Sequence, residues 1–479
     1  MYLRYDPLGV SPNEKQVTGG TEGGGRVRWT PLHDMDQVLY RLAQQAGCNP
    51  FATPEHTQAQ AQMRYRLSGA DRPIVRIGAG WEEFGIEAGT ALETKADYDG
   101  VLEVMSGRDP SGRRQLVEPK KAVSPKAKLA ARPLVDAVEA IAQAAHCTAE
   151  ELLAHDERAA ERYARMLRMV RRDGEAHRVP VKDLERMADA AGVALGMLYD
   201  GDELKSAYAH ADERVRTGAR AFDGVPNMPG STKVLLGVAE EGMAAAIEAE
   251  YHGAVGDALP TLQEWCAYGM TGHHGDGSSA ERLETSGFIG TMTTHLSARP
   301  VDGEVGDPHL HVHLMLAHMV RCSDGEWRTV AAGGYDLMRH TAAFGELVKA
   351  RFRERLTRRL GVQWVWSEHS GEWEIAGITP EMIALFSRRS AQIREEVGED
   401  ATVEQKRAAA RKTAHAKQDV TPTDMLQAWH ARAEEAGIDR AALVARVTGH
   451  GPDGGGAGVG DGHGPQGPAP DPDRVAAAV

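Results

Sequence analysis

The sequence predicts an α+β protein, because patterns of antiparallel strands and of long helices occur in the same chain. Two hairpin patterns are present: apolar stretches flank the turn-rich VDGEVGD segment at residues 301–307, and a second strand pair is indicated at residues 361–378. An amphipathic helical pattern covers residues 132–200, and a long basic helix is indicated at residues 337–360. These local patterns favour the α+β class without fixing the order of the strands.

The N-terminal region begins with a predicted flexible leader at residues 1–25, which ends in TGGTEGGG. A short strand is expected from Arg26, followed by a helix with Thr30 as N-cap and Pro31 as first residue. The same Thr-Pro pair is expected to open a second helix at Thr53. Each of these helices contains a Tyr-Arg-Leu triplet, beginning at Tyr40 and at Tyr65.

The remainder of the chain alternates between helices and strands. Residues 131–220 are expected to form a helical insertion, and a strand that contains Asp223 then leads into a further helix. After the two hairpins, a helical region continues to about residue 447. Residues 451–479 are rich in glycine and proline and are predicted to be disordered. We therefore expect one functional region at residues 26–450.

Length and composition indicate a globular protein. With 479 residues, the chain could form two or three domains or one large domain with insertions, and its 42% of hydrophobic residues can form a substantial core. We find no apolar run of about eighteen residues and no signal-peptide pattern, so we expect a cytoplasmic protein without membrane insertion. Its 4 cysteines lack a CxxC spacing, which argues against a disulfide framework or a cysteine zinc site.

The formal net charge of −14 by itself argues against nucleic-acid binding, because phosphate binding depends on lysine and arginine. The charge is unevenly distributed, however, since residues 336–360 contain seven lysines and arginines against three acidic residues. Such a run is often only a solvated helix face. The alternative is contact with DNA phosphates, for which the candidates are Arg351, Arg355, Arg358 and Arg359.

Three histidines alternate with apolar residues in the segment DPHLHVHLMLAHM, which starts at Asp307. Because successive side chains of a strand point to opposite faces, His309, His311 and His313 share one face, and the apolar residues between them share the other. Clustered neutral imidazoles bind divalent metals well. The alternative is that these histidines are ordinary surface or core side chains.

A further histidine, His295, lies on the preceding strand, sixteen residues before His311. Antiparallel pairing across the turn can bring it beside His311 and His313, so these three side chains form the expected metal site. His309 follows Pro308 at the mouth of the strand and is the less favoured ligand. Because the three ligands are neutral, a bound ion would keep its double charge and open positions, which suits a Lewis acid that acts on a phosphodiester.

A site of this kind needs a nucleophile. Metal-bound water would make the protein a hydrolase, whereas a side-chain hydroxyl would make it a covalent transferase. Tyr40 and Tyr65 are the candidates for the second mechanism, although most tyrosines are packing residues. The residues alone leave these alternatives open.

The stretch GDPHLHVHLMLAHMVRCSDGEW and its continuation to residue 362 resemble the histidine-triad region of the MobF-type conjugative relaxases, members of the HUH endonuclease superfamily. The segments IGAGWEEFGIEAGTALE, FDGVPNMPGSTKVLL and ITPEMIALFSRRSAQI are also similar to segments of that family. The likeness covers residues 26 to 447 and makes residues 26–450 the expected relaxase domain. It implies a central antiparallel sheet that carries the histidine triad, flanked by helices, with a helical insertion and a helical extension that clasps DNA.

The resemblance also implies roles for individual residues. Its metal ligands are His295, His311 and His313. Asp223 matches an acidic residue that orients or deprotonates a reacting group. Family members often have two close pairs of tyrosines, the first of which makes the initial cut, whereas this chain has single tyrosines. Tyr40 is slightly favoured as the nucleophile, because it lies ten residues after Thr30, as the first pair of the family does. Tyr65 precedes a glycine turn, as the second pair does.

The activity implied by the resemblance is site- and strand-specific nicking and rejoining of single-stranded DNA at an origin of transfer, in conjugative transfer of a plasmid or element. A tyrosine would form a 5′-phosphotyrosine and release a free 3′-hydroxyl, with help from a divalent ion, Mg, Mn or Zn. Accessory relaxosome or coupling proteins are the other expected partners. Because no GxxxxGK[ST] motif is found, we expect a relaxase without its helicase motor. The rival predictions are a three-histidine hydrolase that uses activated water and a noncatalytic origin-binding protein.

Overall fold

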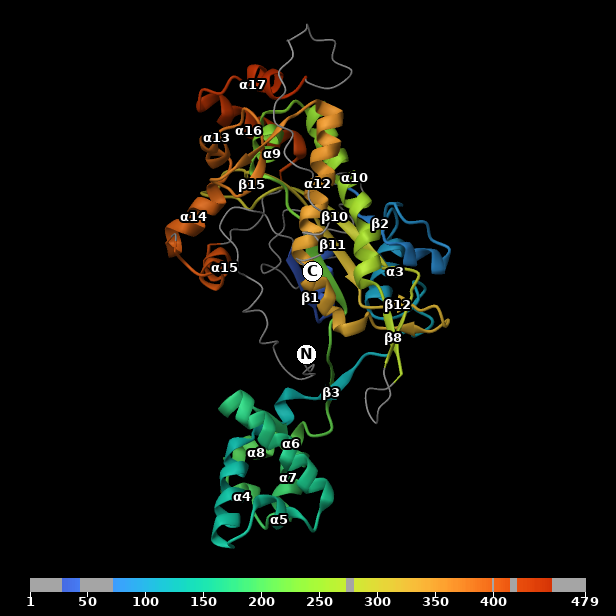
Figure 1. The fold of residues 1–479 in the computed structure, drawn as a ribbon, viewed down its shortest axis with the longest axis vertical. Coiled ribbons are helices and arrows are strands. Elements are labelled where there is room, and N and C mark those ends of the chain that lie inside the picture. Colours follow the sequence, from blue (N-terminus) through green and yellow to red (C-terminus); the bar gives the residue numbers. More distant parts are fainter. Residues whose placement is uncertain (1–27, 44–71, 273–279, 399, 414–419, 450–479) are drawn as a thin grey trace.

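The structure, a computed structural model, describes residues 28–43, 72–272, 280–398, 400–413 and 420–449. At its centre lies a five-stranded antiparallel sheet in the order β1-β7-β11-β10-β2, with helices packed around it (Figure 1). This arrangement confirms the predicted α+β class. The strands are β1 (Arg28–Leu32), β2 (Val75–Ile77), β7 (Ala221–Val225), β10 (Gly290–Ser297) and β11 (Pro308–Ala317).

Two long helices, α10 (Glu241–Cys266) and α12 (Thr341–Leu360), cover one face of the sheet (Figure 1). The even-numbered side chains of β11 point toward them, and Leu310, Val312 and Leu314 are all 0% exposed within this main core. Burial of each such side chain contributes on the order of 2 kcal/mol. The apolar side of the alternating strand is thus explained by the core that it enters.

The opposite face of the sheet is partly covered by the helices α1 (Met35–Ala43) and α3 (Lys95–Met105), with the 3-10 helix η2 (Ala79–Phe84) beside them. Met315 and Ala317 of β11 pack in this second core. These residues lie on the same side of β11 as His311 and His313, because their numbers are odd. The helices therefore cover one end of the histidine face.

A helical lobe projects from the sheet region on an antiparallel strand pair (Figure 1). The pair consists of β3 (Lys121–Val123) and β6 (Arg214–Arg216). The lobe has its own hydrophobic core, which includes Leu134, Tyr163 and Leu184. Its elements are η3 (Pro125–Ala127), β4 (Lys128–Ala130), α4 (Arg132–Ala144), α5 (Ala149–Leu153), α6 (Glu157–Asp173), η4 (Gly174–Ala176), β5 (Arg178–Pro180), α7 (Val181–Ala190), η5 (Leu195–Met197) and α8 (Gly201–Ala209).

The C-terminal helices hold the turn between β10 and β11 in place. The carboxylate of Asp307 in this turn accepts hydrogen bonds from Arg388 Nε at 3.0 Å and Arg432 Nη1 at 2.8 Å. Trp429 Nε1 donates to the carbonyl oxygen of Gly306 at 2.8 Å. The elements of this region are β14 (Trp364–Ser367), β15 (Glu372–Ile375), α13 (Pro380–Leu385), α14 (Arg388–Val397), α15 (Val403–Lys412), α16 (Pro422–Glu435) and α17 (Arg440–Val447), which pack with α9 (Gly230–Val238).

The predicted start of the first helix is wrong. Thr30 and Pro31 do not begin a helix but lie in β1, where Thr30 pairs with Asp223. Proline is tolerated there because β1 is an edge strand. The helix begins at Met35, and Asp34 accepts a hydrogen bond from the Gln37 amide at 2.7 Å, which caps the first turn.

The predicted basic helix at residues 337–360 is divided at His340 into two helices, α11 (Tyr335–Arg339) and α12. The small remaining elements of the described chain are β8 (Gly269–Thr271), β9 (Glu281–Leu283), β12 (Val320–Arg321), β13 (Trp327–Arg328) and η6 (Ala331–Gly334).

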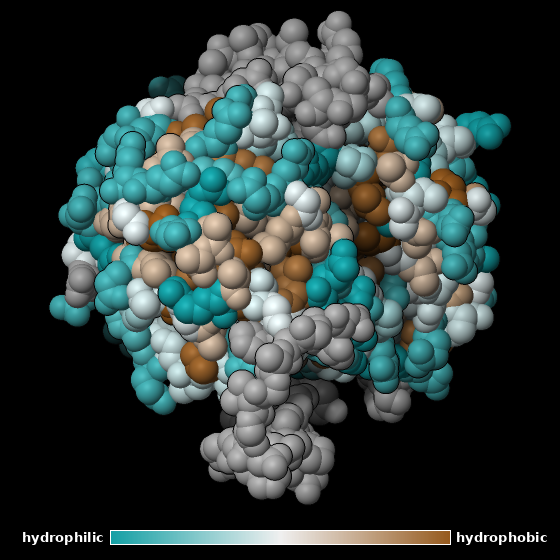
Figure 2. Space-filling model, turned by 90° about the horizontal axis from the view of Figure 1, so that it is seen from above, coloured by the Kyte–Doolittle hydropathy of each residue, from teal (hydrophilic) through white to brown (hydrophobic). Residues whose placement is uncertain are grey.

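Several expectations lie outside the described residues: the leader at residues 1–25, the helix expected from Thr53, and the tail at residues 451–479. Within the described residues, no helix combines the length and the apolar character needed to cross a membrane. Figure 2 shows the molecule from above, with hydrophilic residues over most of this face and hydrophobic residues exposed between them.

Candidate metal centre

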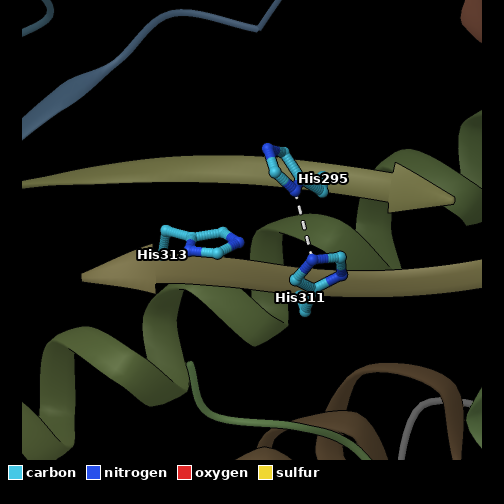
Figure 3. A group of neighbouring side chains, drawn as sticks. All are labelled: His295, His311 and His313. Carbon is cyan, nitrogen blue, oxygen red and sulfur yellow. Dashed lines mark hydrogen bonds between the residues drawn. The ribbon is translucent and has the colours of Figure 1, made fainter. Parts of the chain in front are cut away.

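The three histidines predicted as ligands meet on one face of the β10–β11 hairpin. His295 lies directly opposite His311 in the antiparallel register, and His313 is two residues further along β11. Their rings converge on one point in front of the strands (Figure 3). One ring nitrogen from each histidine lies within 4.8 Å of the corresponding nitrogens of the other two. The hairpin register therefore brings together the three residues that the sequence predicted.

The backbone fixes the orientation of the His311 ring. Its Nδ1 lies 2.7 Å from the carbonyl oxygen of His309, which can only accept a hydrogen bond. In a neutral ring the proton is then on Nδ1, and the lone pair on Nε2 is available. That Nε2 faces His295 Nδ1 at 3.1 Å (Figure 3). Two imidazole nitrogens this close fit either a shared proton or a shared cation.

Asp223 connects the triad to the first helix. It lies on β7, is 1% exposed, and its Oδ1 is 2.8 Å from His313 Nδ1. Its Oδ2 lies 2.9 Å from Arg41 Nε on α1. Hydrogen bonding to Asp223 keeps the His313 proton on Nδ1 and leaves Nε2 as a ligand, which is how metal-binding histidines are commonly oriented.

The donor set fits a divalent transition metal. Three neutral imidazoles are typical ligands of zinc, copper, iron or nickel, and zinc sites with three protein ligands keep a fourth position open. Among the described residues, the cluster suited to metal binding consists of these three histidines without a carboxylate. A bound ion would therefore keep its full double charge for a substrate oxygen.

His309 is on the same strand face but is not part of this cluster. Its ring centroid lies 4.5 Å from that of His311. Burial, together with the positive charge of Lys233, lowers the pKa of His309 to about 3, so the ring is neutral at physiological pH. His309 contributes its backbone carbonyl to the orientation of His311, as described above.

The structure does not show which of the two candidate tyrosine side chains lies nearer the histidine triad. Tyr40 belongs to α1, directly before Arg41, whose guanidinium contacts Asp223. The structure describes the position of Tyr40 in the helix but not its side chain. Tyr65 is among the residues that the structure does not describe. The choice between them stays a prediction.

The four arginines expected to contact DNA lie on α12, on the face of the sheet opposite the triad: Arg351, Arg355, Arg358 and Arg359. Arg355 Nε lies 3.5 Å from Glu250 and 3.6 Å from Asp257, both on α10. Arg351 and Arg358 both contact Glu354 on their own helix. The structure therefore does not bring these side chains to the triad, and their role stays a prediction.

Arg41 is the residue of this site that the sequence analysis missed. It occupies the middle position of the first Tyr-Arg-Leu triplet, directly after the favoured tyrosine. The available signal was chemical: an aspartate placed beside a neutral histidine in a core needs a cation to offset the cost of burying its charge. Arg41 is visible in the sequence, but its proximity to Asp223 could not be predicted from it.

A family model described as TrwC relaxase matches residues 51–436. The multifunctional conjugation protein TraI of Escherichia coli is 30% identical over 171 residues, which cover 34% of this chain and 9% of TraI. The TraI of Escherichia coli strain K12 gives the same values. The match thus spans only a small part of the length of these relatives.

Solved structures with a similar fold include two of the conjugative relaxase TrwC in complex with OriT DNA, one copper-bound and one described as metal-bound. Their TM-scores are both 0.50, with 18% and 17% sequence identity. Each comparison covers 86% of this chain and 99% of the other. At this level of sequence identity, the comparison shows a shared fold only.

Proposed function

Because this chain belongs to the TrwC relaxase family, we propose that it is a conjugative DNA relaxase, which nicks and rejoins one strand of DNA at an origin of transfer. The observation that carries the proposal is the convergence of His295, His311 and His313 beside Asp223 and Arg41. The related solved proteins are bound to OriT DNA, which supports DNA as the substrate.

We propose that His295, His311 and His313 hold a divalent ion, Mg, Mn or Zn, which would supply positive charge to the non-bridging oxygens of a bound phosphate. The donor set favours a transition metal, because magnesium prefers oxygen ligands. The chain contributes the orientation: Asp223 and the His309 carbonyl each hold one imidazole with its lone pair available. These contacts fix the ligand face before the substrate arrives, which lowers the cost of reorganisation.

The proposed reaction is a transesterification. The tyrosine oxygen attacks the scissile phosphorus, the bond from phosphorus to the 3′-oxygen breaks, and the leaving 3′-oxygen takes up a proton. The phenol proton passes to solvent or to a nearby base. The products are a 5′-phosphotyrosine and a free 3′-hydroxyl. One phosphodiester replaces another, so the reverse step can rejoin the strand.

Asp223 is proposed to orient the site rather than to accept the phenol proton. Both of its oxygens are engaged, Oδ1 by His313 and Oδ2 by Arg41. Neither oxygen is therefore left without a contact to receive the phenol proton. Its contact with Arg41 also ties α1 to the sheet, and α1 carries Tyr40. This connection supports Tyr40 as the nucleophile for the first cut, with Tyr65 available for a second transfer.

A strand-transfer assay tests the proposed function. The protein is incubated with an origin oligonucleotide labelled 3′ of the cleavage site, together with a second, unlabelled oligonucleotide that ends in a free 3′-hydroxyl. A relaxase gives a labelled protein band and then a recombinant strand. A three-histidine hydrolase gives cleavage with no labelled protein, and an origin-binding protein gives a mobility shift with no cleavage. Either of the last two results would reject the proposal. Accessory relaxosome or coupling proteins are proposed partners that this assay does not need.

A further inference from the structure

A pocket lies where the strand pair of the helical lobe meets the central sheet. It encloses about 390 Å³ of space, open solvent included. Its walls come from the end of α3, the segment before β3, the segment between β6 and β7, and the residues after β11. The polar residues that line it are Glu118, Lys120, Arg216, Thr217, Arg220, His318 and Thr329.

Cations dominate this lining. Lys120, Arg216 and Arg220 face one carboxylate, Glu118. Arg216 Nη1 donates to the Ser106 carbonyl oxygen at 3.3 Å, and Arg220 Nη1 lies 3.4 Å from Ser106 Oγ. Within the described part of the chain, no carboxylate lies within 4.0 Å of either guanidinium. Both arginines therefore rely on neutral oxygens of one serine.

The two guanidinium groups are electrostatically strained. Burial and the charge of Arg220 lower the pKa of Arg216 to about 10. Burial also lowers the pKa of Arg220, although Asp34 partly opposes this effect. In addition, Arg220 Nε is buried without a hydrogen-bond partner. A buried donor that is left without an acceptor destabilises the fold.

Three other shielded cations of the described chain are each paired with a carboxylate. Arg76 contacts Asp97, Lys349 contacts Glu372, and Arg432 contacts Asp307. Each of these pairs offsets the cost of burying its charge. The pocket differs from these pairs, because Arg216 and Arg220 contact neutral oxygens there and Glu118 is the one carboxylate among its lining residues. A bound anion would provide the missing charge and the missing acceptor.

We propose that this pocket binds a phosphate group. Guanidinium groups present several donors in a planar fork that matches the oxygens of phosphate, and two of them can hold one tetrahedral anion from two sides. The phosphate could be free inorganic phosphate or a non-scissile phosphate of the DNA backbone, and the second source rests on the proposed function. His313 and His318 are five residues apart on and after β11, a span of about 16 Å, so one strand of DNA could reach both sites.

The direct test is titration calorimetry with inorganic phosphate at constant ionic strength. We expect binding to the unaltered protein and an affinity at least tenfold lower in Arg216→Gln and in Arg220→Gln. Arg214→Gln is the matched control, because Arg214 is on the same strand as Arg216, carries the same charge and does not line the pocket. Without phosphate, Arg216→Gln should be at least as stable as the unaltered protein, since it removes a repulsion. A purely structural arginine would instead show lower stability.

The DNA arm uses an origin oligonucleotide and the same three variants. If the pocket holds a backbone phosphate, Arg216→Gln and Arg220→Gln bind DNA more weakly, and Arg214→Gln does not. If it holds free phosphate only, the calorimetric effect appears with unchanged DNA affinity. Either result supports the pocket, whereas unchanged DNA affinity together with no phosphate binding to the unaltered protein would overturn it. The pocket and the relaxase activity can be refuted independently. If the protein binds phosphate but forms no covalent adduct with DNA, only the relaxase proposal is refuted.

Discussion

At the scale of single residues, the site depends on a chain of contacts from Arg41 through Asp223 to His313. The shared face of the histidines could be predicted from the sequence, because strand alternation and hairpin pairing are local properties. Asp223 was expected only from the family resemblance. Arg41 could not be predicted, because its contact with Asp223 depends on how α1 packs against β7. Side-chain pairing between distant segments has no periodic signal in the sequence.

The ligand set makes the first prediction. Replacing His311 or His313 by alanine should abolish metal-dependent nicking and remove bound metal while leaving the fold intact, because the apolar side of β11 is unchanged. Metal content by mass spectrometry and circular dichroism measure the two effects. His309→Ala is the matched control, since it keeps the backbone carbonyl that orients His311. Full metal content and nicking in both ligand variants would exclude the triad.

The second prediction concerns the charge of Asp223. Asp223→Asn keeps the size of the side chain but removes the ion pair with Arg41 and weakens the hold on His313. Loss of such an orienting partner typically costs about 10–100-fold in metal affinity or activity, and we expect a decrease of that order in both. Metal titration and single-turnover nicking measure it. Asp99→Asn, on the surface of α3, is the control, and equal behaviour of the two variants would contradict the orienting role.

At the scale of elements, strand and helix patterns predicted the two hairpins and the helices of residues 132–209. The predicted start of α1 was wrong. The Thr30-Pro31 pair has the chemistry of a helix start, but strand pairing with β7 determines its conformation. A local capping signal can be overridden when the same residues complete the edge of a sheet. The pairing partner of β1 lies about 190 residues away and cannot be recognised from a local pattern.

The C-terminal helices make the third prediction, because they brace the β10–β11 turn. Trp429 is 1% exposed and donates a hydrogen bond to Gly306. Trp429→Ala should lower the free energy of unfolding by about 3–5 kcal/mol, as expected for a large buried aromatic side chain. Denaturant unfolding measures the loss. Trp366→Ala is the control, because Trp366 is 48% exposed, and an equal loss in both variants would show that the brace is unimportant.

The basic helix α12 makes the fourth prediction. Arg358 and Arg359 are exposed on the face opposite the triad. If they contact phosphates, Arg358→Gln/Arg359→Gln should leave the affinity for a short nick-site oligonucleotide unchanged and weaken binding to a longer DNA with duplex flanks. The slope of log affinity against log salt should then decrease by about one for each lost phosphate contact. Unchanged affinity for both DNAs would identify α12 as a solvated helix face.

At the scale of the whole molecule, the sheet joins distant parts of the chain into one site. The strand order β1-β7-β11-β10-β2 places the N-terminal helix next to the hairpin, although nearly 190 residues separate β1 from β7. The α+β class could be predicted from the sequence, but this order could not, because non-local pairings follow from the packing of all layers together. The family resemblance supplied the expectation of a central sheet, which the structure confirms.

The central claim is that a tyrosine on α1 attacks DNA beside the histidine centre. The most direct measurement is mass spectrometry of the peptide that remains attached to a cleaved origin oligonucleotide. We expect the nucleotide on the peptide that contains Tyr40, joined through its 5′-phosphate, and we expect no adduct in Tyr40→Phe. An adduct on Tyr65 that persists in Tyr40→Phe would exchange the roles of the two tyrosines. Cleavage that leaves no nucleotide on any peptide would contradict the covalent mechanism itself.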